Sequence, residues 1–368
     1  GSTALPALLD RVANGSHVPA LKIQGVSSGG QTIYDLTLND VLVSSVSESA
    51  GAGHIPSLSA TFDYGRIGLV TTGFDAGGQQ FPVGIYGWDV TTQRAIEPGS
   101  LDEPGNYGDI GAVGPTTYYL RIDGIAGDSR ADGFEGWFDL DAFGFGQTHS
   151  GTMQLSGGSG AGRPSFDDLN VSLSGNAGLA SLLSRVSEGA VLPALEIVGV
   201  SRGRAVDHKV YDLTLNDIIV SSISGTGTGF QESYIAASFN YGQVGLVTAG
   251  VNTDGSLGRE TEYGFDIAGN VGVDPATLAK PSAATPAFTA NPTAYYLLID
   301  GVSGDSQDDG REGWFKLDAF SLNQTNSSSM QFGSGGAAGL TSFEDISVNL
   351  SGSTALPALL DRVANGSH

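Results

Sequence analysis

The stretch YDLTLNDIIVSSIS at residues 211–224 decides the fold, because it occurs a second time as YDLTLNDVLVSSVS at residues 34–47. In both copies leucine alternates with polar residues before a run of β-branched residues, which is typical of a β-strand. The two copies lie 177 positions apart. A repeat with a fixed period marks one structural unit per copy. The sequence therefore predicts two related modules.

Two further repeats extend this pattern. The run YYLRIDG from Tyr118 returns as YYLLIDG from Tyr295, again 177 positions later. The opening seventeen residues, GSTALPALLDRVANGSH, return unchanged as residues 352–368, so the longer period is 351 residues. We therefore expect this sequence to be one window of a longer tandem array of alternating modules.

The periodicity of the apolar residues predicts many strands and few helices. Strands are expected at 18–26, 32–46, 58–69, 84–91, 118–125, 136–145 and 165–173, with copies at 192–200, 209–223, 235–247, 263–268, 295–302, 313–322 and 342–350. A helix is expected at 4–13, where Leu5, Leu8, Leu9 and Val12 share one face, with Thr3 as its cap and Asn14-Gly15 as its end. Its copy at 177–188 has a matching apolar face made by Leu179, Leu182, Leu183 and Val186.

Proline-rich stretches at 96–117 and 274–294 are the expected linkers. Cutting there leaves one whole module, 118–273. It also leaves a second module split across the chain ends, with 295–351 as its first half and 1–95 as its second. We expect a neighbouring repeat to complete each half.

Composition excludes several classes of function. The net charge of −23 would repel nucleic acid over most of the surface. The absence of cysteine removes disulfides, thiolate metal sites and cysteine nucleophiles. No apolar run approaches the length that spans a bilayer, so membrane insertion is not expected.

A search for catalytic chemistry returns no convincing set. The histidines, at positions 17, 54, 149, 208 and 368, do not recur between the modules. Ser27 and Ser201 lie in GxSxG runs, but a strand is expected to follow where a nucleophile elbow needs a helix. The tryptophans, at positions 88, 137 and 314, lie in strand-like patterns. We therefore expect no enzyme, and no catalytic, cofactor or metal residues.

Acidic loops offer the one clustered constellation. The first contains Asp123, Asp128, Asp132 and Glu135, and the second contains Asp300, Asp305, Asp308, Asp309 and Glu312. Clustered carboxylates can form an oxygen cage for calcium. Asp-Gly pairs also form turns without any ligand, which is the interpretation we favour. Calcium stays an alternative.

In domain order these segments resemble the hemolysin-coregulated protein (Hcp) family, the tube-forming component of type VI secretion systems. The resemblance rests on YYLRIDGIAGDSRADGFEGWFDLDAFGFG, SFDDLNVSL, the short helix, LEIVGV, YDLTLNDIIVSSIS, SFNYGQVGLV and YGFDIAG, in that order. It implies two antiparallel β-barrels, each with one short helix, the second split across the chain ends. It also implies self-association, because family members form hexameric rings that stack as a tube.

Together these features predict a structural, self-assembling repeat unit of an extracellular or cell-surface filament or tube. Its expected partners are copies of itself, joined head to tail. Two alternatives are a spacer repeat in the stalk of a large adhesin and a type VI secretion tube component.

Overall fold

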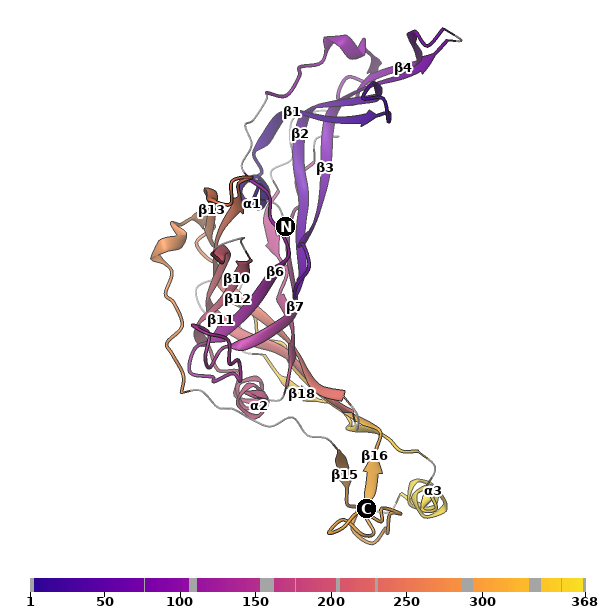
Figure 1. Ribbon diagram of the computed structural model, residues 1–368, viewed down its shortest axis with the longest axis vertical. Helices are drawn as coiled ribbons and strands as arrows, with labels where there is room; N and C mark the ends of the chain where they lie inside the picture. The colour runs from indigo at the N-terminus through magenta and orange to yellow at the C-terminus, as the bar shows by residue number, and fades with distance from the viewer. Residues whose placement is uncertain are drawn as a thin grey trace.

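The structure, a computed structural model, describes residues 3–75, 77–105, 111–152, 162–175, 177–202, 206–228, 231–285, 294–330, 339–351 and 353–366. Within them it has nineteen β-strands, three α-helices and two 3-10 helices, which confirms the prediction of a mainly β protein. None of the helices in these ranges has the length and apolar character needed to cross a bilayer. The molecule is an elongated arc with three parts (Figure 1).

The N-terminal arm (3–105) contains α1 Leu5–Asn14, β1 His17–Val26, β2 Thr32–Gly51, β3 Ser57–Phe74, β4 Gln80–Asp89, β5 Arg94–Ala95 and η1 Pro98–Ser100. The central body (111–285) contains β6 Thr116–Ile122, β7 Phe138–His149, β8 Pro164–Phe166, β9 Leu169–Ser174, α2 Leu179–Glu188, β10 Leu192–Ser201, β11 His208–Thr228, β12 Gln231–Val251, β13 Leu257–Asp266, β14 Val271–Gly272 and η2 Pro275–Thr277. The C-terminal arm (294–366) contains β15 Tyr295–Leu297, β16 Phe315–Leu317, β17 Ala319–Asn326, β18 Thr341–Phe343, β19 Ser347–Asn349 and α3 Leu356–Asn365.

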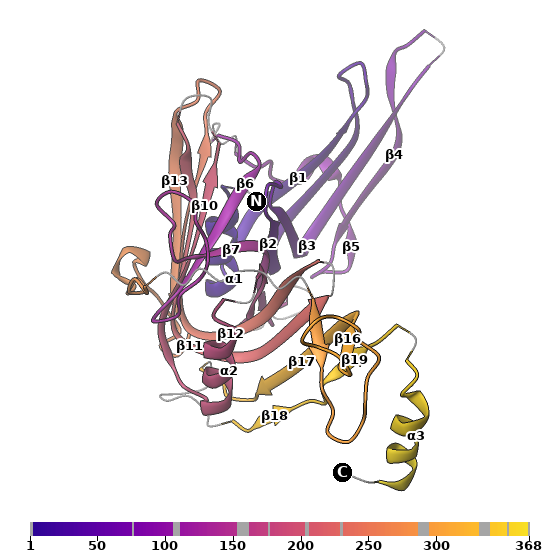
Figure 2. The same cartoon turned by 60° about the horizontal axis from the view of Figure 1, so that its bottom comes forward.

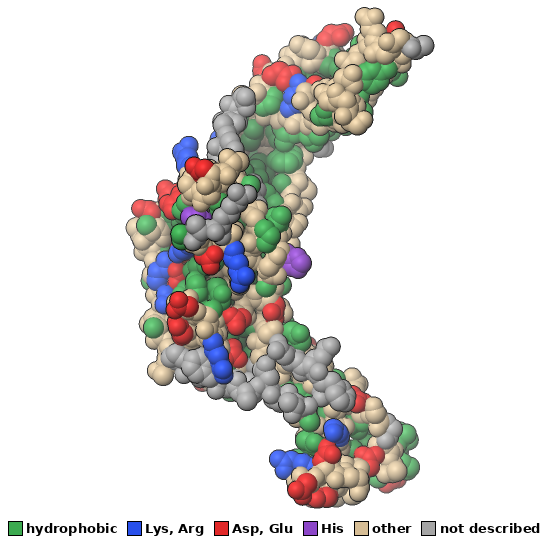
Figure 3. All heavy atoms as spheres, viewed as in Figure 1, with side chains coloured by type: hydrophobic (Ala, Val, Ile, Leu, Met, Phe, Trp, Pro, Cys, Tyr) green, Lys and Arg blue, Asp and Glu red, His purple; other side chains and the backbone are tan. Residues whose placement is uncertain are grey.

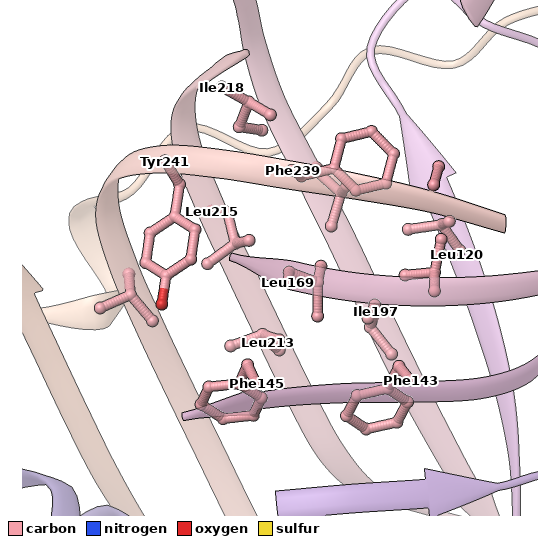
Figure 4. Close-up of a cluster of buried hydrophobic side chains, with 14 of the residues drawn as sticks. Leu120, Phe143, Phe145, Leu169, Ile197, Leu213, Leu215, Ile218, Phe239 and Tyr241 are labelled. Atoms are coloured by element: carbon pink, nitrogen blue, oxygen red, sulfur yellow. The ribbon is translucent and has the colours of Figure 1, made fainter. Parts of the chain in front are cut away.

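Six strands of the central body pair antiparallel in a closed cycle. The order is β6, β7, β9, β12, β11 and β10, and β10 pairs back to β6. Their alternate residues point inward and form the main core, in which Phe143, Leu169, Ile197, Leu213 and Phe239 converge (Figure 4). Burial of such side chains is the dominant favourable term in folding. The strand β13 extends the sheet outward from β12.

The N-terminal arm repeats the second half of this body as an open sheet. Its order is β1, β2, β3 and β4, with β5 on β4. The pair Leu21 and Leu38 corresponds to Leu195 and Leu215 of the body, so the register is the same. The C-terminal arm repeats the first half, with β15 on β16, and with β18 and β19 paired one after the other along β17.

The two arms lie at opposite ends of the arc (Figure 1). Within the described residues, no strand of one arm pairs with a strand of the other. In the described chain, strand edges that are paired within the central body therefore stay unpaired in each arm.

The helices form where their apolar periodicity places them, but their caps differ from expectation. The Thr3 cap is wrong: Ala4 is the N-cap of α1 and its side chain makes no capping hydrogen bond. Thr3 is instead buried, and its carbonyl oxygen accepts a hydrogen bond from Thr261 Oγ1 at 2.6 Å. The predicted end is confirmed, because Gly15 has φ 58°, a left-handed conformation that glycine adopts without strain.

Candidate assembly interface

The first junction joins the N-terminal arm to the central body through one long strand. Beyond Val43 the strand β2 shifts register, and its tail then pairs antiparallel with β7. Seven residue pairs form this contact, from Ser45 with Thr148 to Gly51 with Ala142. The tail therefore fixes one module to the next through main-chain hydrogen bonds, which need no particular side chain.

The second junction repeats the first at an offset of 177 residues. The tail of β11 pairs with β17, from Ser222 with Thr325 to Thr228 with Ala319. Each of these residues is the counterpart of one in the first junction, and the register is identical. The chain therefore makes the same contact twice, once between the N-terminal arm and the central body and once between the body and the C-terminal arm.

The three helices make the same kind of contact, but they differ in how many strands pack on them. The helix α1 packs on β2 of its own arm and on β7, β8, β12 and β13 of the body. The helix α2 packs on β11, β17 and β18, the counterparts of β2, β7 and β8. The helix α3, identical in sequence to α1, lies at the end of the molecule, where Leu359 packs against a small cluster with Phe315 of β16 (Figure 2).

Burial of the shared apolar face follows this order. In α1 the side chains of Leu5, Leu9 and Val12 are 0 to 1% exposed. In α3 their counterparts Leu356, Leu360 and Val363 are 55, 58 and 80% exposed. In α2 the residues Leu182 and Val186 are buried, whereas Leu179 and Leu183 are only partly buried. How much of the apolar face is buried therefore depends on how much of the following part of the chain is present to pack on the helix.

A buried carboxyl group lies inside the first junction. Glu48, in the tail of β2, is 3% exposed and accepts a hydrogen bond of 2.8 Å from the Tyr211 hydroxyl of β11. Burial raises the pKa of Glu48 to about 7, although the Tyr211 bond opposes that shift. Tyr118 of β6 borders the same small cavity. Sequence analysis missed Glu48, because it lies in the polar run SSVSES, where exposure is the ordinary expectation.

The second junction has no carboxyl group at this position. Gly225 is the counterpart of Glu48, and a Cβ there would lie 3.1 Å from the side chain of Leu179 in α2. Tyr34, the counterpart of Tyr211, is exposed in the N-terminal arm. The two junctions therefore share their backbone pairing and differ in their chemistry.

The edges of both arms expose apolar side chains that the body buries. Ile23 of β1 is exposed, whereas its counterpart Ile197 is buried beneath the pairing of β10 with β6. Val348 of β19 is exposed as well, whereas its counterpart Val171 is buried. Apolar side chains gather on the surface of the N-terminal arm, in the upper part of Figure 3. Contiguous exposed apolar surface of this kind marks an interaction site.

The acidic loops have partners within the protein. Asp123 accepts hydrogen bonds from the backbone and side chain of Ser282, and these bonds lower the pKa of its carboxyl group. Asp308 accepts from the Tyr296 hydroxyl at 2.5 Å and pairs with Lys316 at 2.9 Å, which lowers its pKa too. Across the described ranges, no three His, Asp or Glu side chains form a group that could hold a metal ion.

The other candidate side chains are scattered. Ser27 closes a turn with Gln31, and Ser201 ends β10 with its hydroxyl 3.4 Å from the Pro115 carbonyl. The described histidines are also apart: His17 is in β1, His54 in a bridge to Thr116, His149 at the end of β7 and His208 at the start of β11. His368 lies outside the described residues. Trp88 is in β4, Trp137 lies under the Arg121 guanidinium and Trp314 under that of Arg311.

The strand tails and the helix faces thus meet where the arms join the central body. No curated protein matches this chain. One similar solved structure is described as a type six secretion system protein. It is 21% identical over 43% of this chain and 99% of its own, with a TM-score of 0.39. Hcp1 from Salmonella typhimurium is 18% identical over 43% and 99% of the two chains, with a TM-score of 0.35. Hcp3 from Pseudomonas aeruginosa is 14% identical over 41% and 99%, with a TM-score of 0.27.

The decisive similarity is to a protein family. The family described as "Type VI secretion system effector, Hcp" matches residues 119–246 and 296–368, together more than half of the chain. The two matched segments begin at corresponding positions of the two repeats. This chain belongs to the Hcp family of type VI secretion system effectors, and it carries two segments of that family in tandem.

Proposed function

We propose that this chain is a structural repeat unit that assembles head to tail with copies of itself into a filament or tube. The observation that carries the proposal is the junction made twice at an offset of 177 residues, with the same register. A contact between the front of one module and the back of the next is heterologous. Such a contact propagates into an open polymer unless its rotation closes a ring.

The split module supplies the site for the next copy. In the central body β10 pairs with β6, so by correspondence β1 would pair with the segment 294–299 of another copy. This pairing would cover Ile23 and would satisfy the backbone edges that β1 and the segment 294–299 leave open. We infer that 118–273 is one complete module and that 295–351 with 1–95 forms the second only across copies.

The helix series supports the same arrangement. The apolar face of α3 is that of α1, which in this chain lies against the body. In an array with a period of 351 residues, α3 would be the α1 of the following unit. Because the two helices would occupy one place, residues 352–368 of one copy should compete with residues 1–17 of the next.

Family membership supports a place outside the cell, since the family is described as a secretion system effector. It also favours a second candidate function, a component of a type VI secretion tube. A structural role needs no catalytic residues, and the scattered serines and histidines fit such a role.

Electron microscopy of the purified chain across a range of concentrations tests the proposal. Continuous polymers of constant diameter would support the filament. Discrete rings of uniform size would favour the type VI secretion tube component instead. Separate, flexibly strung particles would favour the adhesin stalk. A chain that stays monomeric at the highest concentration reached would refute head-to-tail assembly.

A further inference from the structure

An aromatic cluster lies under helix α1 in the central body. Phe166 of β8 stacks on Phe265 of β13 with ring centroids 5.5 Å apart, and Tyr263 lies 6.4 Å from Phe265. All three side chains are buried. The Tyr263 hydroxyl donates to Oε1 of Gln147 at 3.1 Å, so its polar end has a partner inside the contact. The helix, β8 and β13 thus form one packed unit.

The counterparts of these three residues are divided between the two arms. Phe343 of β18 corresponds to Phe166 and is 71% exposed, against 6% for Phe166. Tyr86 of β4 corresponds to Tyr263 and is 51% exposed, against 4%. Trp88 corresponds to Phe265 and is half-buried. The strand β4 lies at the end of the arc away from β18 and α2, so the three residues do not meet in one chain (Figure 1).

Helix α2 is already seated beside Phe343. Its C-terminal end is held by β18, where Thr341 Oγ1 donates to the Val186 carbonyl at 3.1 Å. It packs on the counterparts of three of the five strands that α1 contacts. The two that are missing correspond to β12 and β13, and those counterparts are β3 and β4 of the N-terminal arm. The partly buried Leu179 and Leu183 correspond to Leu5 and Leu9, which are buried in α1.

We propose that α2 and Phe343 form a docking surface for β4 of a second copy of this chain, with Tyr86 and Trp88 completing the aromatic cluster. The inference rests on the head-to-tail assembly proposed above and names the surface that carries it. The occupant is a second copy because the same chain already seats the same kind of helix on β13, the counterpart of β4.

This docking would couple two events. The surface for α2 lies partly on the C-terminal arm and partly on the N-terminal arm of the next copy. The helix can therefore bury its whole apolar face only when the split module is complete. Completion of the module and docking of the helix then stabilise each other, and assembly should be cooperative.

The first test uses Trp88 as a reporter in the full chain. The difference in fluorescence between the wild-type chain and Trp88→Phe isolates the emission of Trp88, and phenylalanine is the residue that β13 carries at this place. We expect this emission to shift to shorter wavelength over the concentration range in which sedimentation velocity shows association. An unchanged emission through complete association would overturn the docking surface while leaving head-to-tail assembly intact.

The second test is a matched pair of substitutions. Phe343→Ala should weaken association by about 30-fold or more, as for an aromatic residue at the centre of an interface, and should leave the unfolding of the single chain unchanged. Phe166→Ala should instead lower the stability of the single chain, because that residue is already buried. Association of Phe343→Ala at wild-type strength would overturn the proposal.

A double-mutant cycle makes the contact specific. If Trp88 and Phe343 stack across copies, as Phe265 and Phe166 do within the body, Trp88→Ala combined with Phe343→Ala should weaken association less than the product of the two single effects. Independent effects would refute a shared cluster. If the wild-type chain does not associate at all, the proposed function fails, and the docking surface fails with it.

Discussion

Replacing Glu48 by glutamine should remove a pH-dependent weakness of the first junction. The side chain is buried between the tail of β2 and the body, and its described neighbours there include Tyr211, which donates to it, and Tyr118. Neither phenol carries a positive charge that could offset a buried carboxylate. Glutamine keeps an oxygen that accepts from Tyr211 and has no charge to bury.

The magnitude follows from the raised pKa. Burial raises the pKa of Glu48 from 4.5 to about 7, so the folded state holds this proton more tightly than the unfolded state. The contribution of Glu48 to stability is therefore most favourable below pH 4.5, falls as the pH rises from 4.5 to 7, and stays low above pH 7. A shift of this size corresponds to about 3 kcal/mol between the two limits.

Urea unfolding of the wild-type chain and of Glu48→Gln at pH 4 and pH 8 measures this effect. Other titrating groups act on both chains and cancel in the difference. The variant should be close to the wild type at pH 4 and more stable by up to about 3 kcal/mol at pH 8. Amide exchange in residues 45–51 should localise the gain to the junction. A difference that does not change with pH would refute the buried-carboxylate argument.

Three further outcomes are expected. Leu9→Ala should lower the stability of the single chain by about 2–5 kcal/mol, whereas Leu360→Ala, the same change in the identical but exposed helix, should leave urea unfolding unchanged. Equal losses would contradict the helix series. Removal of residues 352–368 should strengthen association measured by sedimentation, because α3 no longer competes with α1 of the next copy, and weaker association would exclude that competition. Arg121→Leu should lower stability in urea unfolding by less than the about 3 kcal/mol that an unpaired buried charge costs, because the buried Glu196 loses its partner at 2.9 Å but keeps Lys280 at 3.0 Å, and a neutral result would show that the Arg121 pair contributes little.

Much of the fold follows from local pattern. The strand expected at 18–26 is β1 with one more residue at its start, and the helix expected at 4–13 is α1 shifted by one residue. These elements carry apolar periodicity in their own sequence, and that periodicity matches the side of each element that is buried. The mainly β class and the family resemblance could both be recognised from the sequence alone.

The junctions could not be predicted in the same way. The strand expected at 32–46 continues to Gly51, and the one expected at 209–223 continues to Thr228. The added residues are SESAG and SGTGT, in which glycine, alanine and glutamate have low strand propensity. They are extended because another module supplies the pairing partner, which is a tertiary contact. The local sequence pattern therefore predicts each strand only up to the residue at which its contact with the next part of the chain begins.

The segments after β5 and β14 are each hydrogen-bonded to the sheet that precedes them in the chain. Asn39 holds the backbone of Asp102 by hydrogen bonds of 2.8 and 2.9 Å, and its counterpart Asn216 holds Ala279 in the same way. These segments, expected to be linkers, thus lie fastened to the sheets.

We call each of these asparagine contacts a clasp, and an ion pair lies beside each one. The ion pair occupies the same place in the two copies, but its positive and negative residues are exchanged. Lys22 pairs with Glu103 at 2.8 Å, whereas Glu196 pairs with Lys280 at 3.0 Å. A single reversed charge would have set two like charges together, which is destabilising. Because both residues of the ion pair are exchanged together, each segment carries a charge opposite to that of its own sheet. The same segment would be repelled by the sheet of the other module. Modules this similar are prone to exchange segments while folding. The paired reversal therefore acts against such exchange.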